Sequence, residues 1–212
     1  MKRSLVKLTS SFIALGLFAA SLAGATTFTV NGTNNVGAYQ AYSEAYPNGG
    51  IVQPVTVTTP AGPWVGGSWI TYNNPDQSWP MRVESGNLPG RYYYLTQFNL
   101  NGFDPATAVI KGSWAADNGS ELYFNTTSLI GTSSGYNSLT NFVIDSGFLP
   151  DHNFLTFVVI NDPYGASPGI NPTGLLVNIA EATANPVPEP STLLLLGGGL
   201  IGVCFMRRRA KN

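Results

Sequence analysis

Cysteine and histidine are almost absent from this chain of 212 residues, which has one of each, Cys204 and His152. A single cysteine cannot form an intramolecular disulfide, so the fold has to be held by core packing. Zinc sites usually draw on several His or Cys ligands, so zinc catalysis is disfavoured. A Ser-His-Asp triad would have to use His152, and no serine lies in a Gly-x-Ser-x-Gly motif. We expect His152 to be an exposed turn residue. We also expect that the protein is not an enzyme.

Charged residues are also scarce, at 10% of the chain, and they are unevenly distributed. Residues 26–185 carry ten acidic and three basic side chains, a net charge of −7, whereas the whole chain has −1. Such an acidic body cannot neutralise a phosphate backbone, which excludes nucleic acid as a natural partner. Anionic polymers are repelled in the same way unless a cation bridges them.

The first 25 residues have the composition of a signal peptide. Lys2, Arg3 and Lys7 precede an apolar run from Phe12 to Ala20, and the run is followed by Ala23-Gly24-Ala25. This small-x-small pattern is what signal peptidase recognises. We expect signal peptidase to cleave after Ala25 and the rest of the chain to be exported.

The other end of the chain combines a rigid turn, an apolar stretch and a basic cluster. Pro188-Glu189-Pro190 keeps the backbone extended, because each proline ring fixes φ and restricts the residue before it. The stretch from Thr192 to Met206 would form a helix of about 22 Å at ~1.5 Å per residue. A bilayer core is roughly 30 Å thick. Arg207, Arg208 and Arg209 should stay on the cytoplasmic side as an anchor. These features predict a transmembrane helix that is held only transiently.

The order and spacing of these three parts resemble a PEP-CTERM sorting signal. The resemblance implies recognition by an exosortase, a membrane-embedded, transpeptidase-like enzyme of Gram-negative bacteria that make extracellular polysaccharide. An ordinary single-pass anchor is the alternative interpretation. The chain is thus divided into a signal peptide (1–25), one domain (26–185) and a sorting signal (186–212).

The domain between the two signals has short apolar runs separated by Gly, Pro, Asn, Ser and Thr, which predicts an all-β fold. The expected architecture is an antiparallel two-sheet β-sandwich, of jelly-roll or galactose-binding-like type. The expected strands are Thr27 to Val30, Ile51 to Thr59, Tyr92 to Leu100, Ala106 to Ala115, Glu121 to Asn125, Thr140 to Asp145, Asn153 to Ile160 and Gly174 to Ala182.

Three of these segments have a pattern that predicts their place in a sheet. From Ala106 to Trp114 the even positions are apolar, which indicates a half-buried strand. Phe154 to Ile160 is apolar at both parities, as in a central strand that is covered on both sides. Pro54 cannot donate to a ladder, so its segment is expected to be an edge strand or two short pieces.

A second resemblance covers residues 98–177, about half of this domain. Gly112-Ser-Trp-Ala-Ala-Asp-Asn118 and Asn171-Pro-Thr-Gly-Leu-Leu-Val177 look like parts of a domain that recurs in PEP-CTERM proteins. That domain is similar to galactose-binding-like β-sandwiches, which implies a fold and contact with glycans. The sequence departs from the pattern at Asp151-His152-Asn153, where a Gly-Asn turn is expected.

Two groups of residues are candidates for binding. Asp104, Asp117 and Asn118 lie beside Pro or Gly at strand ends, where their oxygens could hold calcium. The alternative is that they are turn residues whose side chains bond nearby amides. Aromatic rings are useful on recognition surfaces, and sugars stack on them. We therefore consider a glycan-binding cluster, with core packing as the alternative, of Trp64, Trp69, Tyr72 and Trp79.

These features together predict an exported, non-catalytic protein of the cell surface or extracellular matrix. Its expected partners are signal peptidase, an exosortase, extracellular polysaccharide and, transiently, the membrane. No cofactor is expected other than calcium. The alternatives are a secreted carbohydrate-active hydrolase, which needs a pair of carboxyl groups, and a purely structural matrix protein.

Overall fold

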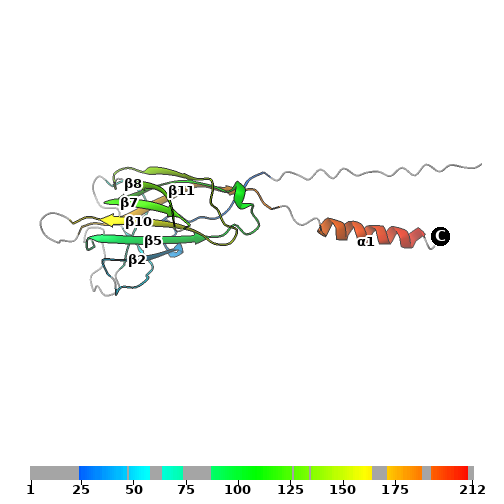
Figure 1. Ribbon diagram of the computed structural model, residues 1–212, viewed down its shortest axis with the longest axis horizontal. Helices are drawn as coiled ribbons and strands as arrows, with labels where there is room; N and C mark the ends of the chain where they lie inside the picture. The colour runs from blue at the N-terminus through cyan, green and yellow to red at the C-terminus, as the bar shows by residue number, and fades with distance from the viewer. Residues whose placement is uncertain are drawn as a thin grey trace, which may run out of the picture.

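The computed structural model describes residues 24–46, 48–57, 64–73, 87–125, 127–133, 135–163, 171–187 and 192–209. In these residues the strands form two antiparallel sheets that face each other, and a helix follows towards the C-terminus (Figure 1). The β-sandwich expected from the sequence is therefore confirmed. Its finer assignment to a jelly roll or a galactose-binding-like fold stays a prediction.

The six-stranded sheet has the order β3-β4-β11-β6-β9, and β1 pairs with the far end of β11. Its centre is β11 on β6, a ladder that runs from Gly174 opposite Asp117 to Thr183 opposite Val109. Its strands are β1 (Thr26–Thr27), β3 (Val55–Val57), β4 (Trp69–Thr71), β6 (Val109–Asp117), β9 (Thr140–Ile144) and β11 (Gly174–Ala184).

The five-stranded sheet has the order β2-β5-β10-β7-β8, with β10 in the middle. Two 3-10 turns, η1 (Val36–Ala38) and η3 (Pro105–Thr107), precede β2 and β6. The strands of this sheet are β2 (Tyr39–Ser43), β5 (Gly90–Phe98), β7 (Gly119–Phe124), β8 (Ser128–Ser133) and β10 (Asn153–Asn161).

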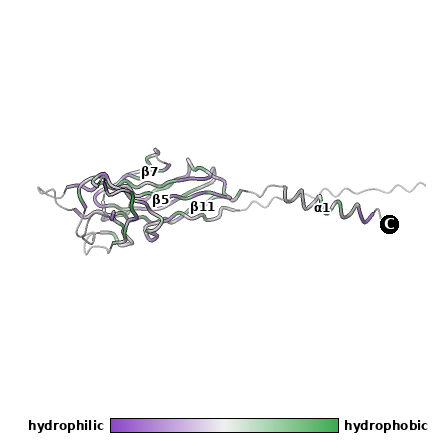
Figure 2. Tube along the Cα trace, turned by 90° about the horizontal axis from the view of Figure 1, so that it is seen from below, coloured by the Kyte–Doolittle hydropathy of each residue, from purple (hydrophilic) through white to green (hydrophobic). Residues whose placement is uncertain are grey.

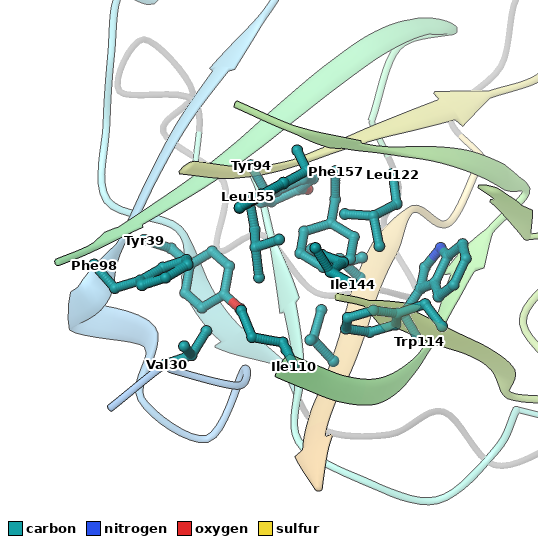
Figure 3. Packing of buried hydrophobic residues seen from close by; sticks show 14 of the residues in the cluster. Val30, Tyr39, Tyr94, Phe98, Ile110, Trp114, Leu122, Ile144, Leu155 and Phe157 are labelled. Atoms are coloured by element: carbon teal, nitrogen blue, oxygen red, sulfur yellow. The ribbon is translucent and has the colours of Figure 1, made fainter. Parts of the chain in front are cut away.

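Aromatic and aliphatic side chains of both sheets meet in the core between them (Figure 3). Trp114 of β6 lies 6.4 Å from Phe157 of β10, measured between ring centroids, and its indole N–H donates to the Ser120 hydroxyl at 2.8 Å. The Tyr39 hydroxyl donates to the backbone oxygen of Asn31 at 2.8 Å. Burial of such rings removes apolar surface from water, while these hydrogen bonds satisfy the polar atoms that enter with them.

The sequence periodicity correctly located the long strands of the core, β5, β6, β10 and β11. Ile110 and Trp114 are buried and Lys111 is exposed, as the alternation in β6 predicted. Ala106 is an exception, because Asp104 and Pro105 start η3 here and delay the strand to Val109. The central position predicted for Phe154 to Ile160 is also confirmed, since β10 pairs with β5 on one side and β7 on the other.

Pro54 divides its segment between the two sheets. On one side of it Val52 pairs with Ala41 of β2 through an isolated bridge, and on the other Val55–Val57 forms the edge strand β3 of the six-stranded sheet. The prediction of an edge strand or two short pieces is confirmed in both respects. The loss of one backbone donor at Pro54 thus lets the chain leave one sheet and join the other.

The helix α1 (Thr192–Arg209) lies apart from the sandwich (Figure 1) and becomes hydrophilic at its C-terminal end (Figure 2). Among the described residues no helix is both long and apolar enough to cross a membrane. The expected transmembrane sorting helix is not confirmed in this respect. The 18 residues of α1 include Arg207, Arg208 and Arg209 as well as four glycines, which lower its apolar character.

Candidate functional site

The aromatic residues predicted to bind glycans are divided by the structure. Trp69 and Tyr72 are fully buried, at 0% exposure each, and the Trp69 indole N–H donates to the backbone oxygen of Val65 at 2.9 Å. A sugar cannot stack on either ring, so the prediction is wrong for these two residues. Their core position follows from β4, which brings Trp69 to one face and Ile70 to the other. Trp79 lies outside the described residues.

Trp64 is the predicted aromatic residue that remains partly exposed. Its ring stacks on Tyr136 at 5.5 Å with an interplanar angle of 25°, and it contacts Trp69 at 4.5 Å. These rings cover Ala115 and Leu176 on the outer face of the six-stranded sheet, forming a second, smaller hydrophobic cluster. Trp64 and Tyr136 are therefore an aromatic patch, although much of their surface is used to cover that cluster.

The three oxygen-bearing residues predicted for calcium have different surroundings. Asp104 caps η3, because its Oδ1 accepts from the Ala106 amide at 3.0 Å. The Asn118 Oδ1 accepts from the Asp162 amide at 2.8 Å and from the Asn171 side chain at 2.7 Å. Both side chains are thus occupied as the turn interpretation predicted. In the part of the chain that the structure describes, no group of three or more His, Cys, Asp or Glu side chains could hold a metal ion.

Asp117 differs from these two residues because one oxygen of its carboxyl is buried without a hydrogen-bond partner. The residue is 3% exposed, and its buried Oδ1 makes no hydrogen bond. Burial first, and the negative charge of Asp162 second, raise the pKa of this carboxyl from 3.8 to about 7. A carboxyl group that titrates near neutral pH can donate as well as accept a proton.

The end of the sandwich that carries Asp117 is held together by asparagines. The Asn161 side chain donates to the backbone oxygens of Asn87 at 2.9 Å and Leu88 at 3.1 Å. The Asn87 and Asn171 backbones pair with each other, and Asn171 reaches Asn118. This network joins the start of β5, the turn between β6 and β7, the end of β10 and the approach to β11.

The outer face of the five-stranded sheet bears a cluster of exposed or partly exposed tyrosines and glutamates that the sequence did not reveal. Tyr42 of β2 is opposite Tyr93 of β5, and their rings stack at 4.6 Å with an interplanar angle of 17°. The Tyr93 hydroxyl donates to Glu44 at 2.5 Å. Glu121 of β7 lies further across the same sheet. We call Tyr42, Tyr93, Glu44 and Glu121 the tyrosine face.

Both carboxylates of the tyrosine face are held in place by neighbouring side chains. Glu121 accepts from Arg91 at 3.3 Å and from the Tyr123 hydroxyl at 3.1 Å, in both cases through Oε2. Burial and the hydrogen bond to Glu44 raise the pKa of Tyr93, so this phenol stays a donor. The face therefore presents fixed acceptors beside aromatic rings.

A groove of about 400 Å³ lies next to the tyrosine face, along β2 and β5. Residues that line it include Gln40, Leu95 and Gln97 of these strands, together with Ile51 and Gln53. His152 is exposed, as predicted. Its Nδ1 lies 2.7 Å from the side-chain amide nitrogen of Gln97, which places the histidine beside this groove. The volume is within the range of ligand pockets.

Other predicted residues belong to the sorting and processing signals. Arg207, Arg208 and Arg209 form the exposed last turn of α1, and Ala25 is exposed just before β1. Ala23, Pro188, Glu189 and Pro190 lie outside the described residues. Cleavage after Ala25 stays a prediction.

The tyrosine face could not be found from the sequence because its residues come from separate strands. Tyr42 lies in Tyr-Gln-Ala-Tyr-Ser, whose alternation would have indicated a strand, and Tyr93 is the outward member of a tyrosine triplet. Only the pairing of β2 with β5 brings the two rings together.

The solved structures that are similar to this chain include two carbohydrate-binding modules. One is the native structure of a family 35 carbohydrate-binding module from Clostridium thermocellum, which is 11% identical in sequence and has a TM-score of 0.35. The match covers 73% of this chain and 98% of that chain. The other is Xyl-CBM35 in complex with a disaccharide that contains glucuronic acid, with 10% identity, 69% and 98% coverage, and a TM-score of 0.29. The β-sandwich is established by the strand pairing and does not depend on these likenesses.

Comparison with sequences identifies the C-terminal segment. No curated protein matches the chain. One family matches, described as the PEP-CTERM protein-sorting motif, over residues 186–209. These residues include Pro188-Glu189-Pro190, α1 and the arginine cluster. The chain therefore carries a PEP-CTERM protein-sorting motif, which marks it as an exported protein that is sorted through the membrane.

Proposed function

We propose that this protein is an exosortase substrate that acts without catalysis at the cell surface or in the extracellular matrix, where it associates with polysaccharide. The observation that carries the proposal is the sorting motif over residues 186–209. In the sequence, Pro188-Glu189-Pro190 lies between β11, the last strand of the sandwich, and α1. A processing enzyme at the membrane could cut here without unfolding the sandwich.

Glycan binding is the molecular role that we propose for the sandwich. Support comes from the partly exposed Tyr42–Tyr93 stack on the outer face of the five-stranded sheet. Aromatic rings offer large apolar surface with few rotatable bonds, which suits them to recognition. The net charge of −7 in residues 26–185 disfavours anionic partners.

Cell fractionation with and without the exosortase tests the sorting part of this proposal. With the exosortase present, the protein should leave the membrane fraction and lack α1. Deletion of the exosortase gene, or the substitution Glu189→Ala, should leave the full chain in the membrane fraction. Identical fractionation in both strains would refute exosortase processing.

A carbohydrate-active hydrolase is a second candidate because of one observation, the buried Asp117 carboxyl with its pKa of about 7 and Asp162 nearby. Glycosidases use a pair of carboxyl groups, one of which is kept protonated by its surroundings. Polysaccharide turnover that is lost in Asp117→Asn would establish the hydrolase and overturn the non-catalytic proposal. A protein that neither binds nor cleaves any glycan, with or without calcium, would instead indicate a purely structural role.

A further inference from the structure

We propose that the tyrosine face and the adjoining groove form one binding site for an uncharged polysaccharide chain of hexose units. This inference rests on the proposed glycan-binding function and assigns a site to it. The site lies on the outer face of the five-stranded sheet, away from the Trp64–Tyr136 patch of the other sheet.

The register of the strands places these side chains in a row. Tyr42 is opposite Tyr93, Tyr93 is opposite Val158, and Val158 is opposite Glu121. Neighbouring strands are about 4.8 Å apart, so the row extends for roughly 14 Å across four strands. An elongated platform of this size suits several linked sugar units better than a single small molecule.

The stacked tyrosines supply the apolar contact that a sugar ring needs. Tyr42 is 41% exposed although it stacks on Tyr93, so part of its ring is open to a ligand. Contact with the C–H groups of a pyranose would remove this surface from water. The mutual stacking also fixes both rings before a ligand arrives, which lowers the entropic cost of binding.

The carboxylates supply hydrogen-bond acceptors at fixed positions. Glu44 is held through Oε1 by the Tyr93 hydroxyl, and Glu121 is held through Oε2 by Arg91 and Tyr123. The second oxygen of each carboxylate makes no hydrogen bond with a described residue. Sugar hydroxyl groups are good donors to such oxygens, and bonds to a charged acceptor are the stronger ones.

The groove continues the site along the same strands. Gln40 and Leu95 are each two residues from the stacked tyrosines and face the same side, about 7 Å along the strand. Gln40, Gln53 and Gln97 offer amide donors and acceptors in a space of about 400 Å³. Amides can pair with sugar hydroxyls as either donor or acceptor, so they add orientation without charge.

The charges of the face determine the class of glycan. Glu44 and Glu121 are acidic, and Arg91, the cation that lies beside them among the residues the structure describes, is already paired with Glu121. Uronic acids or sulfated sugars would therefore meet acceptors that repel them. Glu121 is paired with Arg91 and Glu44 accepts from the Tyr93 hydroxyl, so each carboxylate already has a donor from the protein and neither needs a cationic amino sugar to supply one. An uncharged hexose polymer fits the acceptors, the amides and the rings together.

Affinity electrophoresis of the full chain tests this assignment, in a detergent without a sugar headgroup. The gels contain laminarin, galactomannan or xyloglucan as uncharged probes, alginate as an anionic probe and soluble chitosan as a cationic probe. We expect retardation by at least one uncharged polymer. In Tyr42→Ala the affinity for that polymer should fall about tenfold, because stacking on one ring is lost. Tyr136→Ala, a matched variant on the other sheet, should bind as the parent does.

The outcomes separate the site from the function. Binding that is lost in Tyr136→Ala and kept in Tyr42→Ala overturns the assigned site and leaves glycan binding standing. Binding to alginate or chitosan alone overturns the uncharged class. Absence of binding to every probe overturns the proposed glycan-binding function itself. Circular dichroism on each variant checks that the fold is intact. Tyr93→Phe provides a second test, because it removes the hydrogen bond to Glu44 and keeps the ring, and we expect a smaller loss of affinity than in Tyr42→Ala.

Discussion

The substitution Asp117→Asn is expected to raise the stability of the sandwich at neutral pH and to reduce the dependence of stability on pH. Asp117 ends β6, is 3% exposed and has an Oδ1 without a partner. Burial and the charge of Asp162 raise its pKa from 3.8 to about 7. The folded state therefore prefers the protonated carboxyl, whereas the unfolded chain loses the proton at a lower pH.

The sign and the size of the effect follow from this difference in pKa. A pKa that is higher in the folded state favours folding fully at low pH, and this contribution is lost as pH rises from about 4 to about 7. Each tenfold change in the ionisation equilibrium is worth about 1.4 kcal/mol, so the loss is at most about 4 kcal/mol. Structural relaxation and water penetration reduce such a cost in real proteins, so we expect about 2 kcal/mol.

Urea unfolding between pH 4 and pH 8, followed by tryptophan fluorescence, measures the effect. Trp69 and Trp114 are buried and report on the core. The unfolding free energy of the parent should fall over this range by about 2 kcal/mol more than that of Asp117→Asn. Asp145→Asn, at an exposed position, is the control and should reproduce the parent's curve. Parallel pH profiles of the parent and Asp117→Asn would refute the reasoning.

Two further predictions concern the core and are tested by the same unfolding experiment at one pH. Gly112→Ala should cost about 3 kcal/mol, since its Cβ would lie 2.6 Å from the Phe142 ring. Gly131→Ala is the matched control in a strand, because its Cβ would lie 3.4 Å from Trp114, and it should cost less than about 1 kcal/mol. Equal losses of stability in the two glycine variants would contradict the close packing of Gly112 against Phe142. Trp114→Phe should cost about 2 kcal/mol, because the Ser120 hydroxyl loses its donor at 2.8 Å and the smaller ring leaves a void. An unchanged unfolding midpoint would contradict this prediction.

The core strands could be predicted from the sequence because their burial is periodic. The alternation in β6 follows from the one face that packs in the core, and the apolar run of β10 belongs to a strand with neighbours on both sides, β5 and β7. Three short strands were missed: β2, β4 and β8. In β8 the segment Ser-Leu-Ile-Gly-Thr-Ser alternates poorly and contains glycine, and β4 has three residues, all buried. Pairing with neighbours, rather than local pattern, makes these segments strands.

The candidate site could be predicted only in part, for a similar reason. An aromatic side chain in a loop-like sequence gives no indication of whether it faces solvent, and Trp69 and Tyr72 proved to be core residues. The tyrosine face depends on the register of β2 with β5 and of β10 with β7, which no local pattern contains. The sorting motif was predictable because its parts are contiguous in the chain.

The intact mass of the exported protein tests the central claim most directly. If the PEP-CTERM motif directs sorting and processing, the mature chain should begin at Thr26 and end near Pro188-Glu189-Pro190, without α1. A mature protein that keeps Arg207 to Arg209 at its C-terminus, in cells with a working exosortase, would contradict the account.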